Sequence, residues 1–223
     1  MQNTFKIIWR HGLIYTAGAV AGKAASFFLL PLYGHYLSPA NYGVVNMLGL
    51  ITELTAIVLG VGLSSAMIRY WSKFEDTDQK DRVVSTALGF SLAASGIGIA
   101  LAMLFSPWLA DIVLGGRTYL FALQLMFAAS FFEINLLPPL DLLRAQRQSS
   151  TFVKISLARS ISNMALTIYL IAGRDMGVMG AVWANIAIST IAASLLLAYT
   201  IKQAGGIRIS ADLLRPMLSY GIP

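Results

Sequence analysis

The chain has 223 residues, of which 57% are hydrophobic and only 12% are charged, and its net charge is +6. This composition excludes an ordinary soluble domain and is typical of a membrane protein. The absence of cysteine excludes disulfides, thiolate metal sites and cysteine nucleophiles. The basic residues lie between apolar blocks, which favours a role in membrane topology over binding of nucleic acid.

Six stretches are long and apolar enough to cross about 30 Å of hydrocarbon at ~1.5 Å per residue. In chain order they cover residues 12–36, 42–69, 83–108, 118–143, 152–172 and 176–201. The first stretch exceeds the roughly 7 to 15 apolar residues of a signal peptide, so we interpret it as a retained helix. The sequence therefore predicts an all-α, polytopic membrane helix bundle, in which short links make successive helices antiparallel neighbours.

The last residues of the chain resemble the first. When Gly221 is set against Gly12, Arg215 aligns with Lys6. We interpret residues 1–205 as a six-helix transmembrane lobe, and residues 206–223 as a link and the start of a seventh helix in a truncated second lobe. A parallel repeat of this kind is known among transporters.

Lysine and arginine are distributed unevenly between alternate links, and such residues are retained on the cytoplasmic side. One set of links holds twelve of them: Lys6, Arg10, Arg69, Lys73, Lys80, Arg82, Arg144, Arg147, Lys154, Lys202, Arg208 and Arg215. The opposite set holds two, Arg117 and Arg174. The asymmetry predicts a cytoplasmic N-terminus, with Lys23 and Arg159 remaining inside helices.

Small and polar residues form a stripe along several predicted helices, at about 100° per residue. In the first, second and fifth helices the stripes consist of Gly12, Thr16, Ala19, Lys23 and Ser26; of Asn46, Gly49, Glu53, Ala56, Gly60 and Ser64; and of Ser156, Arg159, Ser160, Asn163 and Thr167. These faces should point at protein or water, because a charge that faces lipid is costly. The sixth helix has small residues at Gly177/Ala181 and Gly180/Ala184, which indicate close helix packing.

Two of these stripe residues are ionisable and deep in the membrane. Lys23 lies about 16 Å from the cytoplasmic start of its helix, near the bilayer midplane, where an ionisable residue indicates a functional site. It is either a cation lining a cavity for an anionic head group or a structural partner of Glu53. Glu53 in turn is either a proton or cation coupling site or a packing carboxylate that burial keeps neutral.

Two more charged residues belong to the fourth and fifth helices. Arg159 lies about 10 Å from the cytoplasmic end and either lines a cavity or snorkels toward the interface. Glu133 precedes Pro138 and Pro139, which free backbone carbonyls and either break the helix near Asp141 or kink it. The candidate substrate or cavity-lining residues are thus Lys23, Glu53, Glu133, Arg159 and Asn163.

No pattern of catalytic or metal-binding residues is found. His11 and His35 fall at opposite ends of the first predicted helix, and no phosphate-binding loop is present. We therefore expect no enzymatic activity, no catalytic residues, no metal and no cofactor.

Five passages resemble the polysaccharide and O-antigen flippases of the multidrug/oligosaccharidyl-lipid/polysaccharide exporter superfamily, which includes MATE-like transporters. They are FFLLPLY at residues 27–33, LSPANYG at 37–43, GVGLSSAMIRY at 60–70, LRAQR at 143–147 and GVMGAVWA at 177–184. The resemblance implies a two-lobed transporter of the bacterial inner membrane, of which this chain is the N-terminal lobe. It further implies a cationic central cavity, export of undecaprenyl-diphosphate-linked oligosaccharides for surface polysaccharide, contact with membrane lipids, a coupling ion (H⁺ or Na⁺), and no nucleic acid.

Two alternatives remain. One is a drug or cation exporter of the same superfamily. The other is a membrane-embedded glycosyltransferase or polymerase, which requires catalytic acids in a sizeable outer loop. The predicted outer links are short, and their acids are Asp111 and Asp175.

Overall fold

The computed structural model describes residues 27–60 and 62–221, and every regular element in these ranges is a helix. Residues 27–36 are helical, and the helices that follow are α2 (Pro39–Gly60), α3 (Leu63–Lys73), α4 (Thr77–Val113), α5 (Leu120–Ala145), α6 (Ser149–Ala172), α7 (Gly177–Gln203) and α8 (Ala211–Gly221). Of these, α2, α4, α5, α6 and α7 are long and apolar enough to span a membrane. The predicted polytopic helix bundle is confirmed, whereas residues 12–26 of the predicted first span lie outside the described ranges.

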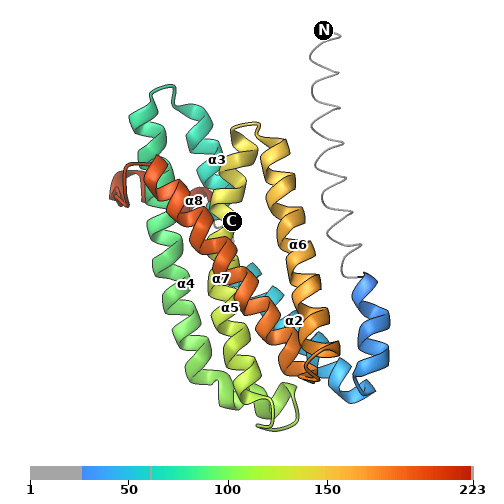
Figure 1. Cartoon of the computed structure of the whole chain (residues 1–223). Helices are drawn as coiled ribbons and strands as arrows, with labels where there is room; N and C mark the ends of the chain where they lie inside the picture. The colour runs from blue at the N-terminus through green and yellow to red at the C-terminus, as the bar shows by residue number, and fades with distance from the viewer. Residues whose placement is uncertain (1–26, 61, 222–223) are drawn as a thin grey trace.

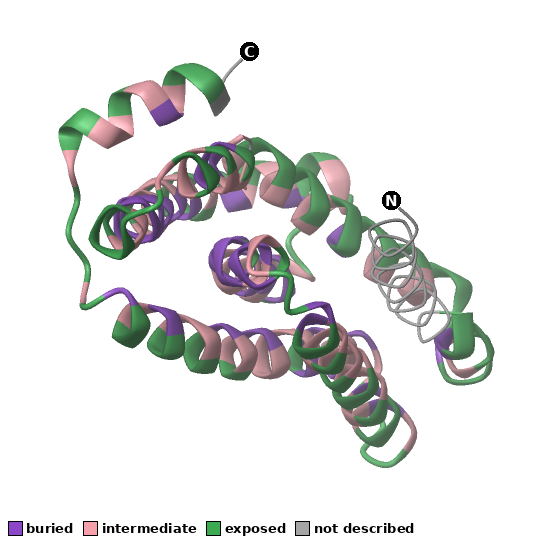
Figure 2. Ribbon diagram, turned by 90° about the horizontal axis from the view of Figure 1, so that it is seen from above, coloured by how far each residue is buried: buried purple, intermediate pink, exposed green. Residues whose placement is uncertain are grey.

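The helices form an up-and-down bundle around α5 (Figure 1). Helix α5 packs against α2, α3, α4, α6 and α7. Seen along the bundle, it is the mainly buried helix in the centre (Figure 2). Because α5 touches protein on most sides, its polar side chains face neighbouring helices, and it is the element on which an internal site can be built.

The second predicted span is divided in two, so the continuous helix expected over 42–69 is wrong. Helix α2 begins at Pro39, where the Asn41 N–H donates to the Ser38 hydroxyl at 3.2 Å in a normal N-terminal cap. It ends at Gly60, and α3 begins after Gly62, whose φ of 78° lies in the left-handed region that glycine adopts without steric cost. The break between α2 and α3 is not apparent from the sequence, because apolar residues continue on both sides of it.

Of the two alternatives expected near Asp141, a break or a kink, the break is wrong. Helix α5 continues through Pro138 and Pro139 to Ala145. Both prolines are buried, so packing by neighbouring helices holds the segment in place where the ladder of backbone hydrogen bonds is interrupted.

The close approach predicted for the sixth span is confirmed between α6 and α7. A side chain added at Gly180 would place its Cβ 2.9 Å from Ile171 Cγ1 and 3.2 Å from the carbonyl carbon of Leu170. The backbone of α6 therefore lies directly against Gly180, and no larger residue fits without moving the two helices apart.

The link between α7 and α8 is attached to the start of α4 by side-chain hydrogen bonds. Ser85 Oγ donates to the Gly206 carbonyl at 2.8 Å and accepts the Arg208 N–H, and Thr86 Oγ1 donates to the Arg208 carbonyl at 3.2 Å. Helix α8 then packs against α3 and α4, with Met217 buried. The segment predicted to lead into a second lobe is therefore hydrogen-bonded to the first lobe where it begins.

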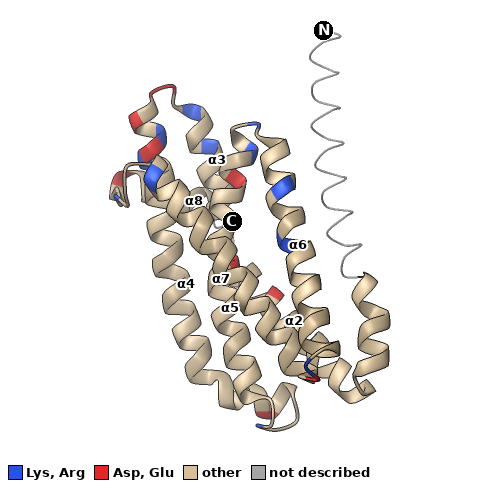
Figure 3. Cartoon of the chain, in the orientation of Figure 1, with Lys and Arg blue, Asp and Glu red and all other residues tan. Residues whose placement is uncertain are grey.

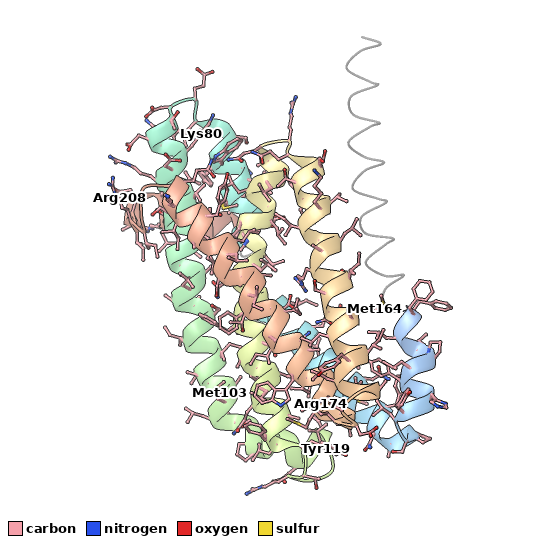
Figure 4. All side chains as sticks on the ribbon, in the orientation of Figure 1. Lys80, Met103, Tyr119, Met164, Arg174 and Arg208 are labelled. Atoms are coloured by element: carbon pink, nitrogen blue, oxygen red, sulfur yellow. The ribbon has the colours of Figure 1, made fainter. Side chains whose placement is uncertain are left out.

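Lysine and arginine gather at one end of the bundle (Figure 3). This end carries the α3–α4, α5–α6 and α7–α8 links, and Lys80 and Arg208 lie there, whereas Tyr119 and Arg174 lie toward the other end (Figure 4). The charge asymmetry found between alternate links is therefore an asymmetry between the two ends of the folded chain.

Candidate functional site

An open cavity of about 730 Å³ lies between residues 27–33 and helices α2, α5, α6 and α7. Its lining includes apolar and aromatic residues such as Tyr33, Tyr42 and Met126. The polar part of the lining consists of Asn46, Glu53, Asn163, Thr167 and Asn185. A largely apolar cavity with a few convergent polar groups is the usual form of a ligand site.

Among the described residues that line this cavity, helix α2 contributes the single carboxylate, that of Glu53. Asn46, Gly49 and Glu53 all face it, as expected from the stripe in the sequence. Among the residues that the structure describes, Glu53 makes no ion pair within 4 Å. A carboxylate in this position can accept hydrogen bonds, exchange a proton or attract a cation.

Helices α6 and α7 place two amides in the same cavity. The Asn185 Oδ1 atom is buried and has no hydrogen-bond partner within the described part of the chain. A buried polar atom without a partner is costly, and such atoms are uncommon in native proteins. On α6, the Asn163 Oδ1 atom accepts a hydrogen bond from the Thr167 hydroxyl at the long distance of 3.4 Å. The cavity therefore offers an unused acceptor to a ligand, an ion or water.

An ion pair lies beside this cavity and joins three helices. Arg159 Nη2 of α6 donates to Glu133 Oε1 of α5 at 2.8 Å, and the Ser189 hydroxyl of α7 donates to the same oxygen at 2.6 Å. The exposed fractions of the two charged side chains are 33% for Arg159 and 21% for Glu133. Charge-assisted hydrogen bonds of this kind are stronger than neutral ones and fix the positions of the helices that supply them.

The helix periodicity shows how the ion pair and the cavity are related. Arg159 precedes Asn163 by four residues on α6, and Ser189 follows Asn185 by four on α7. Residues four apart lie one above the other on a helix, so the ion pair lies about 6 Å from the two asparagines. Because α6 and α7 run in opposite directions, Arg159 and Ser189 both lie nearer the Lys- and Arg-rich end than the two asparagines do. The ion pair therefore forms the boundary of the polar region on that side.

The predicted residues thus divide into three groups. Glu53 and Asn163 line the cavity, Glu133 and Arg159 pair with each other, and Lys23 lies outside the described residues. The Arg159 side chain is directed at α5, so the alternative in which it snorkels toward the interface is wrong. The expected pairing of Lys23 with Glu53 stays a prediction.

Sequence reasoning missed Asn185 and Ser189. They were not identified because the small residues of the sixth span indicated only a packing surface. The available signal was the presence of two polar residues four positions apart in the otherwise apolar first half of the helix, residues 177–189. Within residues 27–60 and 62–221, no group of three or more His, Cys, Asp or Glu residues could hold a metal ion.

A sequence profile described as polysaccharide biosynthesis protein matches residues 35–223. A protein of Haemophilus influenzae described as an uncharacterized membrane protein is 24% identical over 161 residues, which are 71% of this chain and 36% of that protein.

Solved structures with a similar fold belong to transporters. An outward-facing multidrug resistance MATE family transporter of the MOP superfamily has a TM-score of 0.73 and 18% identity, covering 95% of this chain and 51% of that one. A MATE protein in complex with Br-NRF has a TM-score of 0.73 and 20% identity, covering 98% and 53%. A MOP superfamily transporter from Pyrococcus furiosus has a TM-score of 0.71 and 17% identity, covering 96% and 48%. The chain therefore has the fold of about half of such a transporter, and it spans little more than a third of the Haemophilus protein.

Proposed function

The profile of polysaccharide biosynthesis proteins matches residues 35–223, so the chain belongs to that family, and we propose that it forms one lobe of an exporter that flips lipid-linked oligosaccharides across the bacterial inner membrane. The substrate class is an oligosaccharide repeat unit on undecaprenyl diphosphate, and the product supplies surface polysaccharide. The chain works with a second lobe, of which residues 206–223 are the link and beginning.

The observation that carries this proposal is the cavity of about 730 Å³, in whose largely apolar lining Glu53, Asn163 and Asn185 converge. A purely structural bundle has no need of two amides and a carboxylate around one open space, and the buried Asn185 Oδ1 atom costs free energy as long as it has no hydrogen-bond partner. A substrate rich in hydroxyl groups compensates such amides and carboxylates with hydrogen bonds. These converging polar groups therefore favour a sugar over a wholly apolar compound.

The roles of the individual residues follow from their chemistry. Asn163 and Asn185 hydrogen-bond sugar hydroxyls, since an amide both donates and accepts. Lys23 attracts the diphosphate, because Coulomb attraction rises as the dielectric constant falls. Glu53 serves as the site of a coupling proton or Na⁺, and the Glu133–Arg159 pair holds α5, α6 and α7 in register beneath the cavity.

The orientation of the protein rests on the charge difference between the two ends. The end with the α3–α4, α5–α6 and α7–α8 links carries most of the basic residues (Figure 3), and positive residues remain in the cytoplasm. We place this end and the N-terminus on the cytoplasmic side of the inner membrane. The part of the cavity that Tyr33 and Tyr42 line then belongs to the outer half of the membrane.

Two other activities remain as rivals. Export of drugs or cations is favoured by the similarity in fold to a multidrug resistance transporter. A glycosyltransferase or polymerase is less consistent with the chain, because Asp111 in the outer part of α4 is bonded to Arg117 at 3.1 Å and the described outer links are short. A transporter lobe accounts for these features without a catalytic centre.

Export by the complete two-lobed protein tests the proposal. In vesicles that contain a lipid-linked oligosaccharide, the protein should make the sugar accessible to an impermeant glycosidase on the opposite side. Lys23→Ala and Glu53→Gln should lower this rate at least tenfold at normal abundance, whereas Lys23→Arg should keep part of it and Asp111→Asn should keep all of it. Efflux of a cationic dye without sugar flipping would establish the drug-exporter rival, and full flipping by Lys23→Ala would refute the cavity role of Lys23.

A further inference from the structure

A second cavity, of about 450 Å³, opens at the Lys- and Arg-rich end between α5, α6 and α7, and we call it the α5–α7 groove. Its walls are mainly apolar, and its rim is formed by amides and a hydroxyl. The walls include Pro139, Leu142, Leu143, Ile155 and Leu196, and the rim includes Gln146, Gln148, Thr151 and Gln203. It shares no lining residue with the cavity of the candidate site.

The groove is too far from that cavity to be part of it. On α7, Leu196 of the groove follows Asn185 of the cavity by eleven residues, which is about 16 Å along the helix. A ligand in the groove therefore occupies the end of the bundle, and not the middle of the membrane where the Glu133–Arg159 pair lies.

Basic residues lie in the two chain segments that form the groove, next to its lining residues in sequence. The two segments that form it, 139–155 and 196–203, contain Arg144, Arg147, Lys154 and Lys202 but a single acid, Asp141. Asp141 binds Arg144 at 2.8 Å, and the remaining charge of the two segments is +3. The side chains of Arg147, Lys154 and Lys202 are exposed, so they can turn toward an anion at the rim.

Two further features favour an anion at this rim. Thr151 belongs to the first turn of α6, so the positive end of that helix dipole lies beside the groove. The Gln148 amide donates to Gln146 Oε1 at 3.0 Å, which holds two of the rim amides together. Side-chain amides supply hydrogen-bond donors of the kind that phosphate oxygens accept.

Apolar surface continues from the groove along α7. Leu195 and Tyr199 stand four residues apart on this helix, and 68% and 58% of their surfaces are exposed. An exposed apolar strip of this kind is suited to hydrocarbon chains. The groove therefore combines a basic rim at the membrane surface with an apolar wall that leads into the bilayer.

We propose that the α5–α7 groove binds an anionic glycerophospholipid of the leaflet at this end of the bundle. The phosphate lies among Arg147, Lys154 and Lys202, and one acyl chain packs against Leu143, Ile155 and Leu196. Basic pockets between transmembrane helices are known to hold anionic head groups. The bound lipid fills the space between α6 and α7, and this role does not depend on which substrate the protein exports.

Photolabelling in bilayer nanodiscs tests this site. The protein is mixed with a trace of phosphatidylglycerol that carries a diazirine on one acyl chain, and in parallel with the matching phosphatidylcholine probe. Peptides from the end of α5, the start of α6 and the end of α7 should be labelled several times more strongly by phosphatidylglycerol. Equal labelling by the two probes would show that charge does not select the lipid and would overturn the proposal.

Variants separate charge from folding. Lys154→Gln with Lys202→Gln should lower phosphatidylglycerol labelling by about fivefold for each cation removed. Lys154→Arg with Lys202→Arg should retain labelling, and Arg117→Gln with Arg174→Gln, an equal change of charge at the opposite end, should leave it unchanged. Unchanged labelling in the double glutamine variant would overturn the proposal, as would displacement of the probe by a polyprenyl diphosphate but not by unlabelled phosphatidylglycerol.

Discussion

Replacing Arg159 by methionine would leave the ion-paired oxygen of the Glu133 carboxylate with the Ser189 hydroxyl as its remaining hydrogen-bond donor among the described residues. Removing one partner of a fully buried ion pair costs roughly 3–5 kcal/mol, whereas an exposed pair contributes about 0–1 kcal/mol. The exposed fractions of 33% and 21% place this pair between these limits. We expect a loss of about 2 kcal/mol in the free energy of unfolding.

The assay is thermal unfolding in detergent, followed by circular dichroism. For a chain of this size, 1 kcal/mol corresponds to about 2–4 °C, so Tm should fall by about 4–8 °C. Adding Glu133→Met should restore most of the lost stability, because an apolar pair of similar volume needs no desolvation of charge. Arg117→Met is the control, since Arg117 and Asp111 are 65% and 46% exposed and their pair should contribute under about 1 kcal/mol.

Two results would refute this reasoning. If Arg159→Met unfolded at the temperature of the parent protein, the pair would not hold the three helices together. If the double variant lost as much stability as the two single variants combined, the residues would act independently, and the measured coupling would contradict the 2.8 Å hydrogen bond.

Gly180→Val should lower the free energy of unfolding by about 1–3 kcal/mol, because its Cβ would lie 2.9 Å from Ile171 Cγ1 and 3.2 Å from the backbone carbonyl carbon of Leu170. Gly43→Val, with nothing within 4 Å of the added Cβ, is the matched control, and equal Tm values for the two variants would contradict the close approach. Thr77→Cys should react with an impermeant maleimide only from the cytoplasmic side and Arg174→Cys only from the periplasmic side, in a chain without other cysteines; the reverse labelling would invert the topology.

The spans could be predicted from the sequence because hydropathy and the polar stripes depend only on positions along one helix. Asn46, Glu53 and Asn163 all line one cavity, which agrees with the faces that the same periodicity predicts for them. The end of α2 was missed because apolar residues continue past Gly60, while the change of direction depends on the backbone angle of Gly62. The uninterrupted course of α5 through two prolines likewise depends on packing from neighbouring helices.

Pairing between helices was beyond the reach of these patterns. Glu133 and Arg159 are separated by 26 residues, and each was a separate candidate until the crossing of α5 and α6 brought them within 2.8 Å. To predict the hydrogen bond of Ser189 to Glu133, one would also need to know how α7 is turned about its own axis. One-dimensional periodicity gives the face of each residue, but it does not give the depth at which faces of different helices meet.

The ion pair changes how the charge of the cavity must be understood. Arg159 would by itself give a cationic floor, but its charge is balanced by Glu133 at 2.8 Å. The carboxylate in the described lining is Glu53, and the other polar lining residues are neutral amides and hydroxyls. In a region of low dielectric constant, a diphosphate gains nothing from an arginine that is already neutralised. The positive charge that our proposed substrate requires must therefore come from Lys23 or from the second lobe, and Lys23→Ala is consequently the more informative substitution than any change at Arg159.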